Sequence, residues 1–183
     1  MNTRLIFLLI LCCFAKPLLA TELLGLKQQT NGSELLITPH FEVAVSQKVI
    51  DAIDNGIVIT FVYQAKLYHR IDWWFDTVIE SKLHTFEVRY FSLTSEYRLH
   101  HINNKNILNF TSLYELLEHL GQQTNFVFNA DETADYIETR IFLDKQALPS
   151  IMQLPNVFDA DWNLNSDWQQ VAISVADESL SQP

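Results

Sequence analysis

The chain has 183 residues, with 12 Lys and Arg against 22 Asp and Glu, so its formal net charge is −10. A surface with this excess of acid repels phosphate backbones, which argues against nucleic-acid binding. The length is sufficient for one domain with its own hydrophobic core. We interpret the acidic excess as an aid to solubility, and a docking face for a basic partner is the alternative.

The first 20 residues are typical of a signal for export. Arg4 gives them a positive start, ten apolar residues follow from Leu5 to Phe14, and Ala20 offers a cleavage site. Ten helical residues reach about 15 Å, half of the hydrocarbon core of a bilayer, so a cleavable signal peptide fits better than a spanning helix. The large Leu18, at the third position before the cut, leaves retention as a membrane anchor as the alternative.

Both cysteines, Cys12 and Cys13, lie inside this segment. Neither follows the small residue that a lipoprotein cleavage site requires, so no lipid attachment is expected. After cleavage the chain therefore has no transmembrane helix and no thiol for a disulfide, a nucleophile or a metal ligand. The loss of Arg4 and Lys16 leaves 10 basic and 22 acidic residues, a net charge of −12.

The rest of the chain is expected to form one β-rich domain at residues 35–173. The polar segment before it, residues 21–34, is expected to be flexible, and the acidic tail at 174–183 is expected to be frayed. Within the domain, alternation of apolar and polar residues predicts strands, the longest of them starting at Ile57 and Thr77. The expected strands cover residues 35–45, 57–68, 77–90, 97–100, 125–129 and 136–143.

Short helices interrupt these strands. Ser46–Asn55 begins with a serine N-cap and is stopped by Gly56, which adopts the left-handed conformation at a helix end without a steric clash. Leu113–Leu120 places four leucines on one face behind a capping box, and we expect Gly121 to end it. A brief third helical turn is expected after Asp144.

Long neighbouring strands joined by short turns favour antiparallel pairing, because a parallel connection needs a crossover of about a dozen residues. The expected fold is therefore mainly β: an antiparallel, immunoglobulin-like β-sandwich with two or three short peripheral helices. The alternative is an α+β arrangement in which helices cover one face of a single sheet.

The most conspicuous candidate site is an aromatic cluster between the two longest expected strands. Trp73, Trp74 and Phe75 are flanked by Asp72 and Asp76. Adjacent indoles beside carboxylates form a stacking platform or an interface hot spot, because tryptophan dominates both kinds of contact. The alternative is structural: strand alternation would turn one indole inward, where it would seal the end of the sandwich. The two tryptophans and the two aspartates are the candidate binding residues.

No catalytic residue, metal site or cofactor is predicted. The six histidines are scattered, and only His100 and His101 are neighbours, which on a strand point to opposite faces. The chain has no Gly-x-Ser-x-Gly elbow and no glycine-rich loop that would bind phosphate. Paired carboxylates such as Asp72 and Asp76 are frequent on acidic surfaces and do not by themselves indicate a hydrolase.

An ordered set of aromatic, aliphatic and turn-forming residues resembles a known family. The set consists of Asp54-Asn55-Gly56-Ile57, Trp73-Trp74, Arg89-Tyr90, Leu93-Thr94, Tyr97, Ser112-Leu113, Arg140, Leu143-Asp144, Leu148-Pro149, Trp162, Ser166 and Trp168. From about Leu35 to Trp168 the chain resembles DUF4390, a domain of unknown function in exported bacterial proteins. The resemblance implies a periplasmic or envelope location. Because members are often encoded near membrane sensor histidine kinases, it also implies a link to envelope signalling. It supplies no established activity and no catalytic residues.

Three hypotheses for function follow. The first is a non-catalytic domain of the bacterial envelope, periplasmic or secreted, that binds an envelope or membrane protein through a strand edge or the aromatic cluster. The second is a domain that holds a small molecule or lipid between two sheets. The third is a hydrolase that uses an Asp/His pair.

Overall fold

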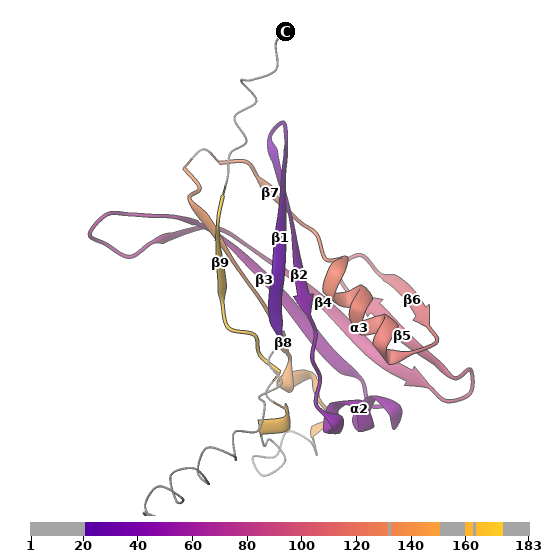
Figure 1. Cartoon of the computed structure of the whole chain (residues 1–183). Helices are drawn as coiled ribbons and strands as arrows, with labels where there is room; N and C mark the ends of the chain where they lie inside the picture. The colour runs from indigo at the N-terminus through magenta and orange to yellow at the C-terminus, as the bar shows by residue number, and fades with distance from the viewer. Residues whose placement is uncertain (1–20, 132, 151–159, 163, 174–183) are drawn as a thin grey trace, which may run out of the picture.

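The computed structural model describes residues 21–131, 133–150, 160–162 and 164–173 (Figure 1). The expected signal peptide and the acidic tail at 174–183 lie outside these residues. The described strands are β1 (Glu22–Asn31), β2 (Glu34–Glu42), β3 (Ile59–His69), β4 (Thr77–Phe91), β5 (Glu96–His101), β6 (Asn106–Phe110), β7 (Phe126–Asn129), β8 (Tyr136–Leu143) and β9 (Gln169–Ala172). The described helices are α2 (Gln47–Asp54) and α3 (Leu113–Gln122), with short 3-10 turns η2 (Lys145–Ala147) and η4 (Ala160–Trp162). Over the described ranges, no helix is long and apolar enough to cross a membrane.

The larger sheet has the strand order β6-β5-β4-β3-β8-β9, and every neighbouring pair is antiparallel. Its centre is β3, where the alternate residues Phe61, Tyr63 and Leu67 are fully buried on one face. The strands from β3 to β6 are joined as successive hairpins. The antiparallel pairing of β3, β4 and β5 was expected from the sequence, whereas β6 was not among the expected strands. The hairpin of β3 and β4 is long, because its pairing runs from Ile59 opposite Val88 to His69 opposite Thr77.

The smaller sheet has the order β1-β2-β7 and corrects the prediction of a flexible segment at 21–34. Residues Glu22–Asn31 form β1, which turns at Gly32 with a φ of +57° and pairs along the whole of β2. The polar composition misled the prediction because β1 lies at the edge of the sheet. It needs few apolar side chains there, since backbone hydrogen bonds to β2 supply its order.

The two sheets pack face to face and enclose the core. Phe41 of β2 meets Tyr63 of β3 at a ring separation of 5.6 Å, and Tyr63 meets Phe86 of β4 at 5.7 Å, both edge to face. The predicted mainly β, antiparallel sandwich with short peripheral helices is therefore confirmed, and the single-sheet alternative is not adopted. The division into three and six strands differs from the immunoglobulin arrangement.

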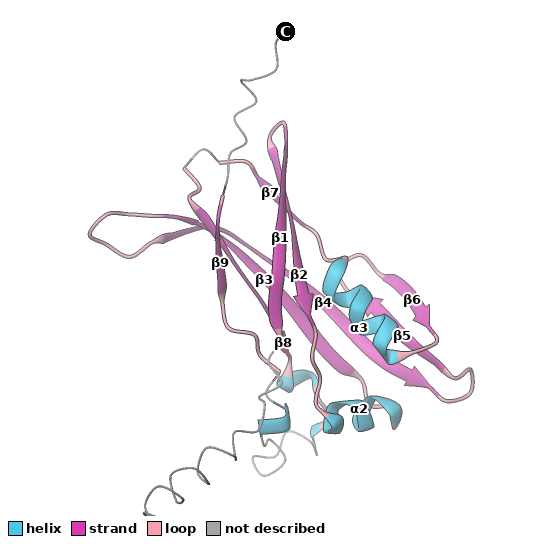
Figure 2. Cartoon of the chain, viewed as in Figure 1, coloured by secondary structure: helices cyan, strands magenta, loops and turns pink. Residues whose placement is uncertain are grey.

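Helix α3 lies in the same layer as the smaller sheet and covers β5 and β6 (Figure 2). The prediction that Gly121 ends this helix was wrong, because α3 continues to Gln122 and is capped by Gln123. Gly121 is needed for close packing instead: a Cβ atom there would lie 2.2 Å from the carbonyl oxygen of Phe41 in β2. The first predicted helix is confirmed as α2, whose N-cap Ser46 accepts a hydrogen bond from the Val49 amide.

Candidate functional site

The turn between β3 and β4 carries the three aromatic residues singled out in the sequence. Trp73, Trp74 and Phe75, which we call the aromatic tip, expose 101 %, 77 % and 84 % of their surfaces. The hairpin projects sideways from the sandwich (Figure 1). The interpretation that one indole seals the core was therefore wrong, since neither Trp73 nor Trp74 is buried.

The pairing of the strands explains this exposure. β8 accompanies β3 only as far as Tyr68, and β5 accompanies β4 only from Phe86 onward. The residues between these points have no neighbouring strand beyond the hairpin itself, and residues 71–78 are all exposed. Strand alternation also ceases at the turn, so it does not direct either indole toward the core. The aromatic tip thus extends past the smaller sheet, which does not cover it.

Trp73 has an uncommon backbone conformation. Its φ is +69°, a left-handed value that bulky side chains rarely adopt. The turn is closed by a hydrogen bond of 3.3 Å from the Trp74 amide to the Ile71 carbonyl. Residues in such conformations cost about 1–3 kcal/mol each and cluster at functional sites. The fold maintains this conformation although it brings the Trp73 side chain no buried contact.

Asp76 braces the turn against the body of the sheet. Its Oδ2 accepts a hydrogen bond of 2.7 Å from the hydroxyl of Tyr136 in β8, and its Oδ1 accepts one of 3.3 Å from the Ile71 amide. Tyr136 in turn stacks on Tyr68 at 4.9 Å. Burial and the bond to Asp76 raise the pKa of Tyr136, so its hydroxyl stays protonated as a donor. Of the predicted binding residues, Asp76 is therefore a positioning residue.

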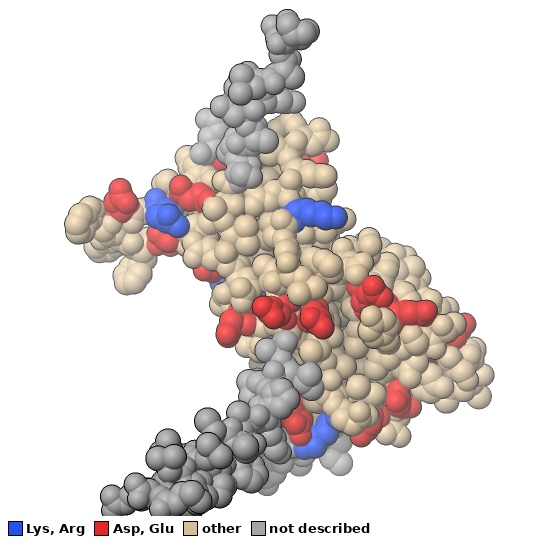
Figure 3. All heavy atoms as spheres, viewed as in Figure 1, with Lys and Arg blue, Asp and Glu red and all other residues tan. Residues whose placement is uncertain are grey.

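Asp72 differs from Asp76 in its contacts. Its side chain is exposed, and it forms no hydrogen bond or ion pair with the part of the chain that the structure describes. Unlike Asp76, Asp72 is therefore not among the described residues that brace the turn. In Figure 3, the outermost atoms of the hairpin are uncharged, and acidic and basic side chains follow nearer to the body.

A second brace, which the sequence did not indicate, lies at the base of the hairpin. The Oδ2 of Asp135 accepts hydrogen bonds from the Arg70 amide at 2.6 Å and from Nδ1 of His69 at 3.0 Å. These bonds lower the pKa of Asp135, the bond from the Arg70 amide most of all. The loop between β7 and β8 therefore fixes the point from which the aromatic tip projects.

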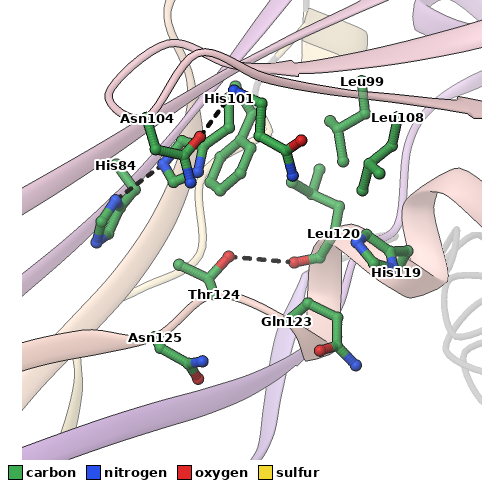
Figure 4. A pocket seen from close by; sticks show the side chains of 12 residues that line it. His84, Leu99, His101, Asn104, Leu108, His119, Leu120, Gln123, Thr124 and Asn125 are labelled. Carbon is green, nitrogen blue, oxygen red and sulfur yellow. Dashed lines mark hydrogen bonds between the residues drawn. The ribbon is translucent and has the colours of Figure 1, made fainter.

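A pocket of about 370 Å³ lies on the opposite side of the core, where α3 passes into β7 (Figure 4). We call it the polar pocket. Its hydrogen-bonding side chains come from β4, β5, the β5–β6 turn, the start of β6, α3 and the α3–β7 linker. They are His84, His101, Asn104, Asn106, His119, Gln123, Thr124 and Asn125. Its apolar floor is formed by Phe86, Leu99, Leu108 and Leu120.

The polar pocket brings together two histidines that are far apart in sequence. His101 lies opposite Phe86 in the β4–β5 pairing, so it sits diagonally across from His84 on the same face. The Nδ1 of His84 and the Nε2 of His101 are 3.0 Å apart. The neighbouring His100 points to the other face and contacts Glu87 instead. Sequence spacing alone could not find the pair, because the register of the hairpin creates it.

The two histidines are expected to give the domain a pH response, to which His119 adds because burial also lowers its pKa. Burial lowers the pKa of His84 and His101, so the unfolded chain takes up protons before the folded chain does. We expect the free energy of unfolding to fall as the pH drops through the ordinary histidine range. Urea unfolding at about pH 7.5 and about pH 5.5 measures this loss.

His101→Phe is the matching variant for this experiment, and it should lose less stability on acidification than the natural chain. An identical loss in both proteins would contradict the assignment. Asp131 and Asp135 do not affect this comparison. Their pKa values are lowered from the ordinary value of 3.8, so the stability that they contribute is lost only at a lower pH.

The fold and these two regions define a class: an antiparallel β-sandwich with a braced aromatic hairpin and a small uncharged pocket. In the described ranges, no three His, Cys, Asp or Glu side chains gather closely enough to hold a metal ion. The chain belongs to the DUF4390 family, described as a domain of unknown function, which matches residues 22–172. This confirms the resemblance seen in the sequence and extends it to include β1. No curated protein and no solved structure matches the chain.

Proposed function

We propose that this chain is a non-catalytic binding domain of the bacterial envelope that recognises a protein partner through its aromatic tip. The observation that carries the proposal is the almost complete exposure of Trp73, Trp74 and Phe75 on a projecting hairpin. Tryptophan is the residue most enriched at interface hot spots, and contiguous exposed apolar surface marks interaction sites. The left-handed φ of Trp73 supports the same conclusion, because the fold sustains its cost.

The charges around the aromatic tip favour a protein partner over a lipid surface. Asp72 lies directly beside Trp73, and the chain after residue 20 has a net charge of −12. Bilayer surfaces that contain anionic lipids would repel this domain. A protein with an apolar pocket and basic residues at its rim complements both the indoles and the carboxylate. Such a partner also agrees with the alternative interpretation of the acidic composition, in which the acidic surface is a docking face for a basic partner.

The contacts of the polar groups near the tip support a non-catalytic role. Asp76 is engaged by Tyr136 and by the Ile71 amide. The Asp–His contact of this region, Asp135 with His69, is also bonded to backbone groups of the adjoining loops. Both arrangements position the hairpin. The envelope location is supported by the sequence pattern of residues 1–20, which is typical of an export signal, and by the bacterial context that the family resemblance implies.

Truncation of the indoles tests the proposal. A tagged chain would be used to recover partners from envelope extract, and a photo-crosslinking residue at position 75 would identify the partner in direct contact. We expect Trp73→Ala/Trp74→Ala to weaken binding of the purified partner by at least about thirtyfold, since truncating a hot-spot residue costs about 2 kcal/mol or more. Calorimetric titration of the partner measures the affinity.

Tyr114→Ala is the matched control, because Tyr114 is an aromatic residue of α3 with 75 % of its surface exposed. It should bind the partner as the natural chain does. Both variants should unfold at the temperature of the natural chain or close to it, since exposed side chains contribute little to stability. Unchanged affinity of the double variant for the crosslinked partner would remove the aromatic tip from the function.

A further inference from the structure

The polar pocket carries an inference that is independent of the aromatic tip. None of the residues that line it is Asp, Glu, Lys or Arg, although these residues make up 19 % of the chain. A charged ligand that entered it would lose hydration without finding an opposite charge, which is unfavourable. The pocket therefore selects against carboxylates, phosphates and amines. The same consideration disfavours fatty acids, whose head group is charged.

The side chains at the rim retain hydrogen-bonding capacity. Asn125 uses its Oδ1 to accept from Thr38 at 2.7 Å, and Asn104 uses its Oδ1 to accept from the Asn106 amide at 3.0 Å. Their amino groups, and the whole side-chain amide of Gln123, form no hydrogen bond with the residues described. An amide offers both donors and acceptors. The rim is therefore suited to hydroxyl and amide groups of a ligand, which also both donate and accept.

The histidine pair extends this neutral network. The Nδ1 of His84 and the Nε2 of His101 lie 3.0 Å apart, so in the neutral pair one of these nitrogens donates and the other accepts. The second nitrogen of each ring then has the opposite role and adds to the hydrogen-bonding groups of the pocket. Burial, which lowers the pKa of both rings, keeps the arrangement uncharged near neutral pH.

The floor of the pocket adds apolar contacts to the hydrogen bonds that the rim offers a ligand. Phe86, Leu99 and Leu120 are buried in the core and present an apolar surface beneath the polar rim. A ligand that fits both must have an apolar face and uncharged, hydrogen-bonding edges. A pyranose ring has this character, since its C–H groups form a face and its hydroxyls lie around the edge. The volume of about 370 Å³ lies in the range of small-molecule sites.

We infer that the polar pocket is a binding site for a neutral saccharide unit, held over the apolar floor by Asn104, Gln123, Asn125 and the His84–His101 pair. The sugar ring lies against Leu99 and Leu120, and its hydroxyl or acetamido groups bond to the rim.

Nuclear magnetic resonance titration of the full chain, purified as its host processes it, tests this site. The neutral probes are glucose, N-acetylglucosamine, maltose and N,N′-diacetylchitobiose, and the charged counterparts are glucuronate and glucosamine. Each is added up to about 10 mM, which detects dissociation constants in the millimolar range. We expect at least one neutral sugar to shift the imidazole signals of His84 and His101 and the side-chain amide of Gln123, and the charged sugars to leave them unchanged.

Gln123→Glu replaces an amide of the rim by a carboxylate of the same shape. Because Gln123 is exposed, the variant should fold normally, and its affinity for the neutral sugar should fall by at least about tenfold. Gln29→Glu introduces the same charge on β1 and should leave the affinity unchanged. The inference is overturned if none of the four neutral sugars shifts these signals, or if glucuronate binds as well as glucose. Equal affinity in both variants would also overturn it.

Discussion

Tyr63→Ala is expected to lower the free energy of unfolding by about 4 kcal/mol, as is typical when a large buried aromatic side chain is truncated. Tyr63 is fully buried at the centre of β3, and its ring makes edge-to-face contacts with Phe41 and Phe86. Phe41 belongs to the smaller sheet and Phe86 to the larger one. Removal of the ring therefore leaves a cavity where the two layers meet.

Tyr63→Phe separates the hydroxyl from the ring. The hydroxyl donates a hydrogen bond of 2.8 Å to the carbonyl of Leu120, in the last turn of α3. Burial raises the pKa of Tyr63 well above its ordinary value, so the group remains a donor under all working conditions. Loss of this buried bond should cost about 1–2 kcal/mol.

Guanidinium unfolding followed by circular dichroism would measure this series, with Tyr114→Phe as a control on the exposed face of α3. The control should change the free energy of unfolding by less than about 0.5 kcal/mol. Equal losses for Tyr63→Ala and Tyr63→Phe would contradict the role assigned to the ring. A Tyr63→Phe variant as stable as the natural chain would contradict the role assigned to the hydroxyl.

Gly121→Ala is expected to destabilise the domain by about 2–3 kcal/mol, although the same change in an exposed helix would stabilise it by about 1 kcal/mol. The new Cβ would lie 2.2 Å from the carbonyl oxygen of Phe41 and 3.3 Å from its carbonyl carbon. Both are backbone atoms of β2, so neither can turn aside as a flexible side chain would. Helix α3 must move away from the smaller sheet to make room.

Gly25→Ala is the matched control for this substitution, because a Cβ at Gly25 in β1 would meet nothing within 4 Å. It should leave the free energy of unfolding unchanged or raise it by about 0.5 kcal/mol, through reduced freedom of the unfolded chain. Thermal or denaturant unfolding of both variants checks the pair. A Gly121→Ala variant that is as stable as Gly25→Ala would show that α3 does not pack on the β2 backbone in this way.

The two candidate sites depend on different parts of the fold. The aromatic tip depends on the length of the β3–β4 hairpin and on the braces from Asp76 and Asp135, both of which lie outside the core. The polar pocket depends on the packing of α3 near Tyr63 and Gly121. Substitutions at the tip should therefore affect partner binding without changing sugar binding. Substitutions at Gly121 should disturb the pocket first, because α3 contributes to its wall.

The sequence by itself determined the local elements and the family. Alternation over many residues located β3, β4 and β8, because a strand with one buried face must repeat every second residue. The serine N-caps of α2 and α3 were evident, because they act within three residues. Strands β1, β6 and β9 were missed because each lies at the edge of its sheet, where a strand can be largely polar and still be held by its backbone hydrogen bonds.

Only the tertiary structure decided the features on which the two proposals rest, because each arises from segments far apart in the chain. The exposure of Trp73 and Trp74 follows from where the neighbouring strands stop, and no property of the cluster itself reveals that. Gly121 is a glycine because the backbone of β2 passes close by. His84 and His101 meet because a hairpin register brings them together. Sequence patterns report the local conformation of a segment, whereas burial and convergence depend on what packs against it.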